Sequence, residues 1–228
     1  INQQYHALSA EGFRVLAVAE AATTPHDLPT NQSEFVLRYL GLVAFYDPPK
    51  SHIRSIFEKF QKAGIRIKVI TGDNEITTRA IARQAGLPAE SHPVQGEKLL
   101  TLHDAEFDRE VQRGDLFTRM FPEAKLRIIE SLKRQGEVVA MTGDGVNDGP
   151  ALKAAHIGIA MGKRGSEIAR QASALILTTD DLSLLVTGLA MGRKIYSNLK
   201  KAIQYIISIH IPIILTVALP LLLGWAYP

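Results

Sequence analysis

Two carboxylates and one carboxamide lie within five residues of this sequence, at Asp144, Asn147 and Asp148. They belong to the segment MTGDGVNDGPAL (residues 141–152), which follows an apolar run and precedes a helix-like stretch. A polar turn at the end of a strand in an α/β sheet is suited to Mg²⁺, a hard cation that takes oxygen ligands. The glycines allow the backbone to turn tightly and to approach a ligand. The alternative is a plain turn, where Gly, Asp and Asn are common without any chemistry.

Four other short motifs occur in order along the chain. They read GFRVLA at residues 12–17, DPPK at 47–50, TGD at 71–73 and FPEAK at 121–125. Together with residues 141–152 they resemble the motifs of P-type ATPases, ion pumps that form an aspartyl-phosphate intermediate. The resemblance extends from residue 12 to about residue 224, with Lys50 in place of the usual Arg and Gly149 in place of the usual Ala.

The resemblance implies a role for each matching residue. The catalytic residues it implies are Thr71, Gly72, Asp73, Lys125, Asn147 and Asp148. The residues implied to contact the phosphates of ATP are Arg14, Thr71, Asp73 and Lys125. The residues implied to bind Mg²⁺ are Asp144 and Asp148.

Two lysines have a plain interpretation as solvated surface side chains. Lys125 shares its predicted helix with Arg127 and Lys133, which are expected at the surface, and only the FPEAK context favours phosphate binding. Lys68 belongs to none of the matching motifs and is expected at the surface.

Two motifs of the family are missing from the sequence. The family's phosphorylated aspartate lies in DKTGT, and its water-directing glutamate lies in TGE; neither string occurs here. The first residue is Ile1, and residues 1–14 match the middle of a domain. We therefore expect an interior fragment of a pump, which has no nucleophile of its own.

Apolar runs and helix-like stretches alternate along the chain. The predicted strands are residues 15–19, 35–45, 65–70, 116–120, 137–141, 157–161 and 174–177. The predicted helices are residues 51–63, 75–85, 122–135 and 146–155. This alternation predicts an α/β fold with a mainly parallel sheet and helices on both faces, and the resemblance implies the haloacid-dehalogenase-like form of it. The carboxyl edge of such a sheet would gather Thr71, Asp73, Asp144 and Asn147.

Composition and resemblance together give a domain organisation. We expect residues 1–32 to be the end of a nucleotide-binding domain, with a loop at 21–32. Residues 33–180 are expected to form the phosphorylation domain, and residues 181–228 a stalk and membrane helix. The 26 basic and 23 acidic residues give a net charge of +3, too balanced for a nucleic-acid-binding surface. The absence of cysteine excludes disulfides and thiolate metal sites in these 228 residues.

The C-terminal part has the character of a membrane helix. Asp180 and Asp181 mark the expected helix start, and residues 202–225 are dominated by Ile, Leu, Val and Ala and carry no charge if His210 is neutral. About 20 apolar residues are enough to cross a bilayer as a helix. The basic pairs at 193–194 and 200–201 precede the run, which places that end and the catalytic domain in the cytoplasm. The alternative is a buried core helix.

One histidine interrupts the apolar run. His210 falls where calcium-pump-like members carry an Asn ligand, and Ile213 falls where they carry a Glu. Two interpretations stay open for His210: it lines the ion path, or it forms a hydrogen bond with a neighbouring helix.

Three functions are compatible with these observations. The first is part of a multi-pass membrane pump that uses ATP and Mg²⁺ to transport a cation, in contact with lipid and the remaining pump domains. The second is a soluble phosphatase of the same fold with Asp47 as nucleophile, although Pro49 replaces the Asp that such enzymes usually carry two residues later. The third is a non-catalytic membrane-anchored module.

Overall fold

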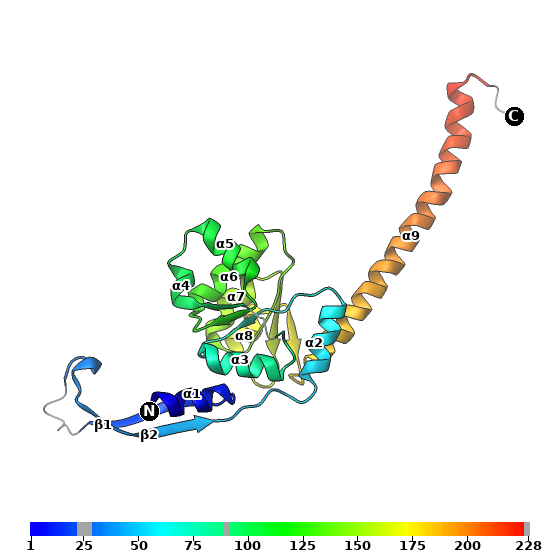
Figure 1. The fold of residues 1–228 in the computed structure, drawn as a ribbon. Helices are drawn as coiled ribbons and strands as arrows, with labels where there is room; N and C mark the ends of the chain where they lie inside the picture. The colour runs from blue at the N-terminus through cyan, green and yellow to red at the C-terminus, as the bar shows by residue number, and fades with distance from the viewer. Residues whose placement is uncertain (22–28, 89–91, 226–228) are drawn as a thin grey trace. The chain divides into compact units, whose positions relative to one another are not determined.

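The chain folds as two separate units. The computed structural model describes residues 1–21, 29–88 and 92–225, and it divides the chain into Ile1–Asp181 and Leu182–Pro228. The first unit contains every strand and eight of the nine described α-helices, and the second unit contains the helix α9 (Figure 1). The finer separation of residues 1–32 from residues 33–180 stays a prediction.

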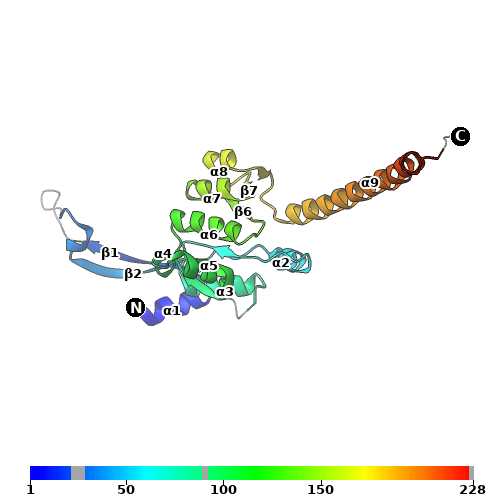
Figure 2. The same ribbon diagram turned by 90° about the horizontal axis from the view of Figure 1, so that it is seen from above.

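Parallel strands form the centre of the first unit. One sheet has the order β3 (Val69–Ile70), β5 (Leu116–Thr118), β4 (Pro93–Gln95), and the other has the order β6 (Ala140–Gly143), β7 (Ile157–Met161), β8 (Leu175–Leu177). Every pairing within these two sheets is parallel. Helices surround the strands in both views (Figures 1 and 2). The predicted parallel α/β fold is confirmed.

The first two strands form a hairpin of their own. β1 (Arg14–Ala21) pairs antiparallel with β2 (Leu37–Phe45), with a register shift at Val18 and Ala19. Both strands were expected from their apolar residues. The short 3-10 helix η1 (Gln32–Glu34) precedes β2. Of the predicted loop at 21–32, residues 22–28 lie outside the described part of the chain.

All four helices predicted before residue 181 are present, and four others in the described chain were not predicted. The predicted ones are α2 (Ile53–Lys62), α3 (Glu75–Gln84), α6 (Pro122–Arg134) and α7 (Gly149–Ala154), the last preceded by the 3-10 turn η2 (Val146–Asp148). The unpredicted ones are α1 (Asn2–Ala10), α4 (Gly96–Leu100), α5 (Asp104–Arg113) and α8 (Glu167–Ala172). The strand β4 was also not predicted.

The helix α6 is the central element of the packing. Pro122 occupies its first turn, where the missing N–H is not needed, and Gly136 follows its end with φ 83°, a conformation that favours glycine. Its inner side buries Ala124, Ile128 and Ile129. One apolar cluster joins these side chains to Phe117 of β5 and to residues of β6, α7 and β7. Burial in this cluster fixes the strand ends around which the polar motifs lie.

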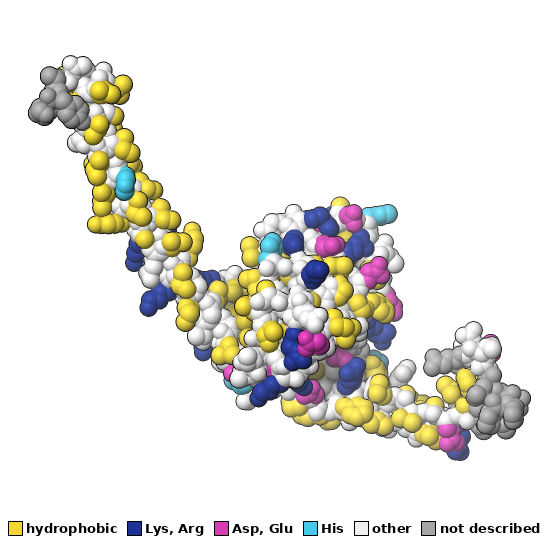
Figure 3. Space-filling view, turned by 180° about the vertical axis from the view of Figure 1, so that it is seen from behind, with side chains coloured by type: hydrophobic (Ala, Val, Ile, Leu, Met, Phe, Trp, Pro, Cys, Tyr) yellow, Lys and Arg dark blue, Asp and Glu magenta, His cyan; other side chains and the backbone are white. Residues whose placement is uncertain are grey.

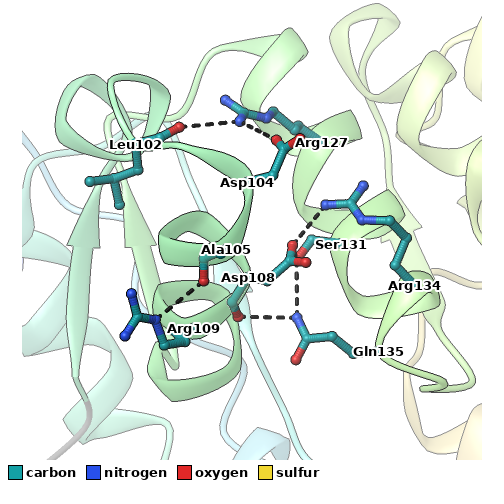
Figure 4. A network of polar contacts seen from close by, with 9 residues as sticks. All are labelled: Leu102, Asp104, Ala105, Asp108, Arg109, Arg127, Ser131, Arg134 and Gln135. Atoms are coloured by element: carbon teal, nitrogen blue, oxygen red, sulfur yellow. Dashed lines mark hydrogen bonds and ion pairs between the residues drawn. The ribbon is translucent and has the colours of Figure 1, made fainter.

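A polar network fastens α5 to α6 (Figure 4). Asp108 accepts hydrogen bonds from Ser131 Oγ at 2.6 Å and from Arg134 Nη2 at 2.7 Å. Arg127 lies over the ring of Phe107 and donates to Asp104 at 2.9 Å. The hydrogen bond from the Ser131 hydroxyl, and to a smaller extent the one from Arg134, lowers the pKa of Asp108 below its ordinary value. The fold therefore favours the ionised form of this carboxyl group.

We expect Asp108→Asn to lower the free energy of unfolding by about 1 kcal/mol at pH 7, because it removes a charge-assisted pair of hydrogen bonds. The pKa of Asp108 is lower in the folded than in the unfolded state. The ionised carboxylate therefore stabilises the fold at pH values above the unfolded-state pKa, and this stabilisation is lost as the pH falls through the folded-state pKa. The difference between the two proteins should therefore disappear under acid conditions. Thermal unfolding of the full chain in detergent, followed by circular dichroism, measures it. Asp104→Asn is the control, because the Asp104 side chain is 83% exposed and should matter little.

Lys68 lies beside the C-terminal end of α5 and is not a plain surface lysine. Its ammonium donates to the carbonyls of Val111, at 2.8 Å, and of Gly114. Burial, and then the nearby Arg66 charge, lower the pKa of Lys68 to about 8. The surface expectation was wrong because the contact joins residues far apart in the sequence.

The second unit consists of one helix. α9 (Ser183–Leu222) is 40 residues long, so it extends for about 60 Å. It continues through Pro212 and Pro220, and within its bounds no residue is buried. On the face drawn in Figure 3 hydrophobic side chains predominate along this helix, with basic side chains toward its N-terminal end. By length and composition it is one candidate membrane span in the described chain.

Candidate functional site

A tight turn after β6 carries the first group of predicted site residues. The carboxylate of Asp148 folds back over this turn and accepts a hydrogen bond from the backbone N–H of Gly145 at 3.2 Å. A Cβ atom at Gly143 would lie 2.7 Å from Cβ of Asp148, so only glycine fits there. The sequence of the turn therefore serves to bring Asp148 close against the end of the strand.

Lys125 pairs with Asp148 inside this turn. Its Nζ lies 2.7 Å from Oδ1 of Asp148, and the two side chains are only 15% and 12% exposed. Lys125 sits in the first turn of α6, which Pro122 and the apolar face of the helix hold in place. The plain interpretation of Lys125 as a solvated lysine is therefore wrong. A partly buried ammonium fixed by a carboxylate is a positioned donor for an anionic group.

The end of β3 carries a second polar group. Thr71 Oγ1 donates to Oδ2 of Asp73 at 3.2 Å and accepts from the Asp73 backbone N–H at 3.1 Å. Arg14 at the start of β1 reaches Oδ1 of Asp73, with 3.3 Å between the atoms. Asn74 caps α3 by accepting from Thr77 N at 2.9 Å, a role that sequence reasoning did not assign. Thr71 and Asp73 thus form one unit, to which Arg14 is attached.

Three predicted site residues face open space. Asp144 and Asn147 are exposed, and among the described residues no hydrogen bond or ion pair engages the Asp144 carboxylate. Gly72 is also exposed, and a Cβ atom there would have no described atom within 4 Å. The packing of the chain therefore does not require glycine at position 72. The open space leaves room for a ligand at the end of β3.

The donor set suits Mg²⁺ better than a metal that needs many protein ligands. Among the described residues no group of three or more His, Cys, Asp or Glu side chains could hold a metal ion. One free carboxylate at Asp144 is what a Mg²⁺ site with several waters and a substrate phosphate requires from the protein. Asp148 is already occupied by Lys125 and Gly145, so Asp144 is the better placed of the two predicted ligands.

Asp180 is a buried residue that sequence reasoning assigned to a different role. It was expected to start the long helix, but α9 has Leu182 at its N-cap and no side-chain cap there. The Asp180 carboxylate instead accepts the backbone N–H groups of Lys163 and Arg164. The doublet Asp180-Asp181 was visible in the sequence, but only the fold shows which way the first carboxylate points.

Asp47, the nucleophile that a soluble phosphatase would need, forms no hydrogen bond or ion pair with the groups at β3 and β6 in the described chain. It follows β2, a strand of the antiparallel hairpin, and it is exposed. It lines a cavity of about 640 Å³ together with Lys50, Lys163 and Asp180. Neither Thr71 nor Asp144 lines that cavity.

His210 forms a hydrogen bond within its own helix. Its Nδ1 lies 2.8 Å from the Ile206 carbonyl oxygen, and because a carbonyl only accepts, Nδ1 carries the proton. Ser208 bonds back to Gln204 O in the same way. Helix geometry places His210 about 200° around the axis from Ser208, so these polar groups do not gather on one face. The role of His210 in an ion path stays a prediction.

Comparison with known proteins gives a consistent picture. The family model for haloacid dehalogenase-like hydrolase matches residues 4–156. Calcium-transporting ATPase 1 of Bacillus cereus is 38% identical over 229 residues, and cation-transporting ATPase pma1 of Synechocystis is 38% identical over 232 residues; both alignments cover 100% of this chain. Calcium-transporting ATPase 1 of Saccharomyces cerevisiae is 34% identical over 96% of the chain. The chain spans only 26%, 26% and 24% of these relatives, about a quarter of their length.

Proposed function

This chain belongs to the haloacid dehalogenase-like hydrolase family, and from that premise we propose that it is the phosphorylation domain and one membrane helix of an ATP-driven cation pump. The transport activity named for its relatives is theirs, and the proposal extends it to a full-length protein that contains this chain. In that protein ATP would phosphorylate an aspartate outside these 228 residues. The resulting aspartyl-phosphate would then be hydrolysed.

The observation that carries the proposal is that two groups of polar side chains each lie at the carboxyl end of a parallel strand. Thr71 and Asp73 follow β3, and Asp144 to Asp148 follow β6, where Lys125 of α6 pairs with Asp148. Ligands of α/β sheets bind beyond the carboxyl ends of the strands. Phosphoryl transfer needs positioned donors and neutralised charge more than covalent help from the protein. The groups at the two strand ends have this character.

Each side chain has a task that its contacts support. Lys125 would donate to a phosphoryl oxygen while Asp148 holds its ammonium in place. Thr71 would donate its hydroxyl, and Asp73 would orient it. Arg14, joined to Asp73, would reach the phosphates of ATP. Gly72 would leave room for the transferred group, and Asn147 would support the turn.

Asp144 and Asp148 are the two carboxylates predicted to serve Mg²⁺. We assign direct binding to Asp144, because its carboxylate has no partner among the described residues, and a supporting role to Asp148. The bound metal would supply positive charge to the phosphate oxygens.

The missing nucleophile would fit between the two parallel sheets. In the described chain no backbone ladder joins β3 to β6, although one apolar cluster packs against both strands. A further parallel strand between them would end beside both polar groups. We propose that the phosphorylated aspartate stands at the end of such a strand.

The helix α9 supports a membrane location. Its apolar surface and its length suit a bilayer span, and its basic N-terminal part suits the cytoplasmic side. In the full-length protein we propose several spans, with the catalytic unit in the cytoplasm. A self-sufficient phosphatase is less well supported, because Asp47 shares its cavity with neither Thr71 nor Asp144 and Pro49 replaces the Asp that such enzymes usually carry.

Phosphoenzyme formation tests the proposal directly. We expect the full-length protein to incorporate acid-stable, hydroxylamine-sensitive label from [γ-³²P]ATP with Mg²⁺, because an acyl phosphate has this reactivity. The 228-residue chain alone should take up none, because it lacks the nucleophile. Stoichiometric label on Asp47 in the chain alone would support the phosphatase, and its loss in Asp47→Asn would prove the site.

A further inference from the structure

Asp180 adopts an unusual backbone conformation with a buried side chain. Its φ of 56° lies in the left-handed region, which few residues other than Gly, Asn and Asp adopt. The residue is only 7% exposed. Its backbone carbonyl oxygen accepts a hydrogen bond from Lys50 Nζ at 2.7 Å, and this bond helps to hold the backbone conformation. A buried carboxylate in a fixed conformation needs partners that satisfy both oxygens.

Those partners are the backbone amides of the turn between β7 and α8. Oδ1 accepts from Lys163 N at 2.9 Å, and Oδ2 accepts from Arg164 N at 3.0 Å. The hydrogen bond from Lys163 is the largest cause of the lowered pKa of Asp180, and Arg164 acts in the same direction. The carboxylate therefore stays ionised at neutral pH and holds two consecutive amides of the turn.

The same turn contacts the backbone of Asp144. Gly165 lies so close to Met161 that an added Cβ would be 1.9 Å from its carbonyl oxygen, so the path of the turn is tightly constrained. One residue later, Ser166 N donates to the Asp144 carbonyl oxygen at 2.8 Å. Ser166 also starts α8, where its hydroxyl accepts from Ala169 N at 3.2 Å. A continuous set of contacts thus leads from Asp180 to Asp144.

We propose that Asp180 is a positioning residue for the metal site, because its carboxylate holds residues 162–166 in the path that fixes the backbone of Asp144. This inference rests on the proposed function, since Asp144 is there the metal-binding carboxylate. Asp144 has no side-chain partner among the described residues, so its backbone contacts decide where its carboxylate lies. Partners that orient a metal ligand affect metal affinity without touching the metal.

The first test replaces Asp180 by asparagine. Asparagine tolerates the left-handed conformation, so Asp180→Asn keeps the backbone but replaces one acceptor by a donor and removes the charge. We expect the full chain in detergent to bind Mn²⁺, measured by electron paramagnetic resonance, about tenfold more weakly than the wild type. Trypsin should also cleave faster after Lys163 and Arg164. The control Asp181→Asn changes the neighbouring carboxylate and should alter neither result.

The second test acts on the contact with Asp144 itself. Ser166 has φ −64°, which proline adopts, and Ser166→Pro replaces the N–H donor by a ring carbon that pushes the Asp144 carbonyl oxygen away. Ser166→Ala removes only the helix-capping hydroxyl. Proline should weaken Mn²⁺ binding about tenfold, and alanine should leave it within about twofold of the wild type. This pair keeps the inference testable even if Asp180→Asn fails to fold.

The outcomes separate this inference from the proposed function. If the wild type binds Mn²⁺, if Asp144→Asn abolishes that binding and if Asp180→Asn and Ser166→Pro bind normally, the positioning role is wrong and the metal site stands. Faster cleavage by trypsin with unchanged Mn²⁺ affinity has the same meaning, because Asp180 then only braces the turn. If the wild type binds no Mn²⁺, the metal assignment of Asp144 falls, and the inference falls with it.

Discussion

Replacing Asp144 by asparagine is expected to abolish phosphorylation of the full-length protein by Mg·ATP while the fold stays intact. The side chain is exposed and has no partner in the described chain, so its loss removes no internal contact. The backbone bond from Ser166 to the Asp144 carbonyl is unaffected by the change. Removing a negative charge from a metal site on which the reaction depends costs several kcal/mol, so the rate should fall by at least ~10²-fold. Acid-quenched ³²P incorporation at ordinary Mg²⁺ measures this rate.

The matched control changes an exposed carboxylate on α6. Glu130→Gln makes the same chemical substitution away from both polar strand ends, and it should phosphorylate at the wild-type rate. Circular dichroism should report the same helix content for both variants. Near-normal phosphoenzyme formation by Asp144→Asn would show that the turn after β6 is purely structural and would remove Asp144 from the metal site.

A charge in the middle of α9 is expected to prevent its insertion into a membrane. On insertion scales an aspartate at the centre of a spanning helix costs ~+2.5–3.5 kcal/mol. Ile211 lies near the middle of the apolar run and is 52% exposed in the isolated helix, so an aspartate there has no protein partner to offset that cost within α9. Ile211→Asp should therefore reduce the inserted fraction strongly. A glycosylation tag fused after residue 228 reports insertion in microsomes.

Ile203→Asp is the control for position. It follows Lys200 and Lys201 closely, so its carboxylate can reach the interface, and insertion should fall much less. In the wild type the tag should report the side opposite to the basic end. A tag that stays on the cytoplasmic side would exclude a single span and would favour a helix buried against other protein segments.

Local sequence patterns were sufficient for the elements that carry the predicted site. The run 157–161 became β7 with the same bounds, and the helix expected at 122–135 is α6 between the same Pro and Gly signals. The turn with Gly143, Asp144 and Asp148 follows β6 as expected. In each case glycine conformation, apolar periodicity or proline geometry acts over a few neighbouring residues, which is why sequence alone reveals it.

Other elements depend on contacts that local patterns do not encode. β4 is three residues long and begins with proline, yet it forms because β5 pairs with it. α5 is strongly polar, and only its buried Phe107 and Val111 join the core. β3 has two residues, whereas the predicted strand at 65–70 had six, because within the described chain only Val69 and Ile70 of that run pair with β5. Strand length follows the available partners rather than the apolar residues alone.

The sequence by itself determined the types and order of the chemical groups: a carboxylate turn, a Thr–Asp pair, a lysine after a helix-starting proline and an apolar helix at the end. Tertiary structure alone decided their partners. It placed Lys125 against Asp148, Lys68 at the end of α5 and the Asp180 carboxylate on the turn at 162–166. The physical reason is burial: an ionisable side chain removed from water must find a partner, and that partner is provided by whichever segment the fold brings next to it.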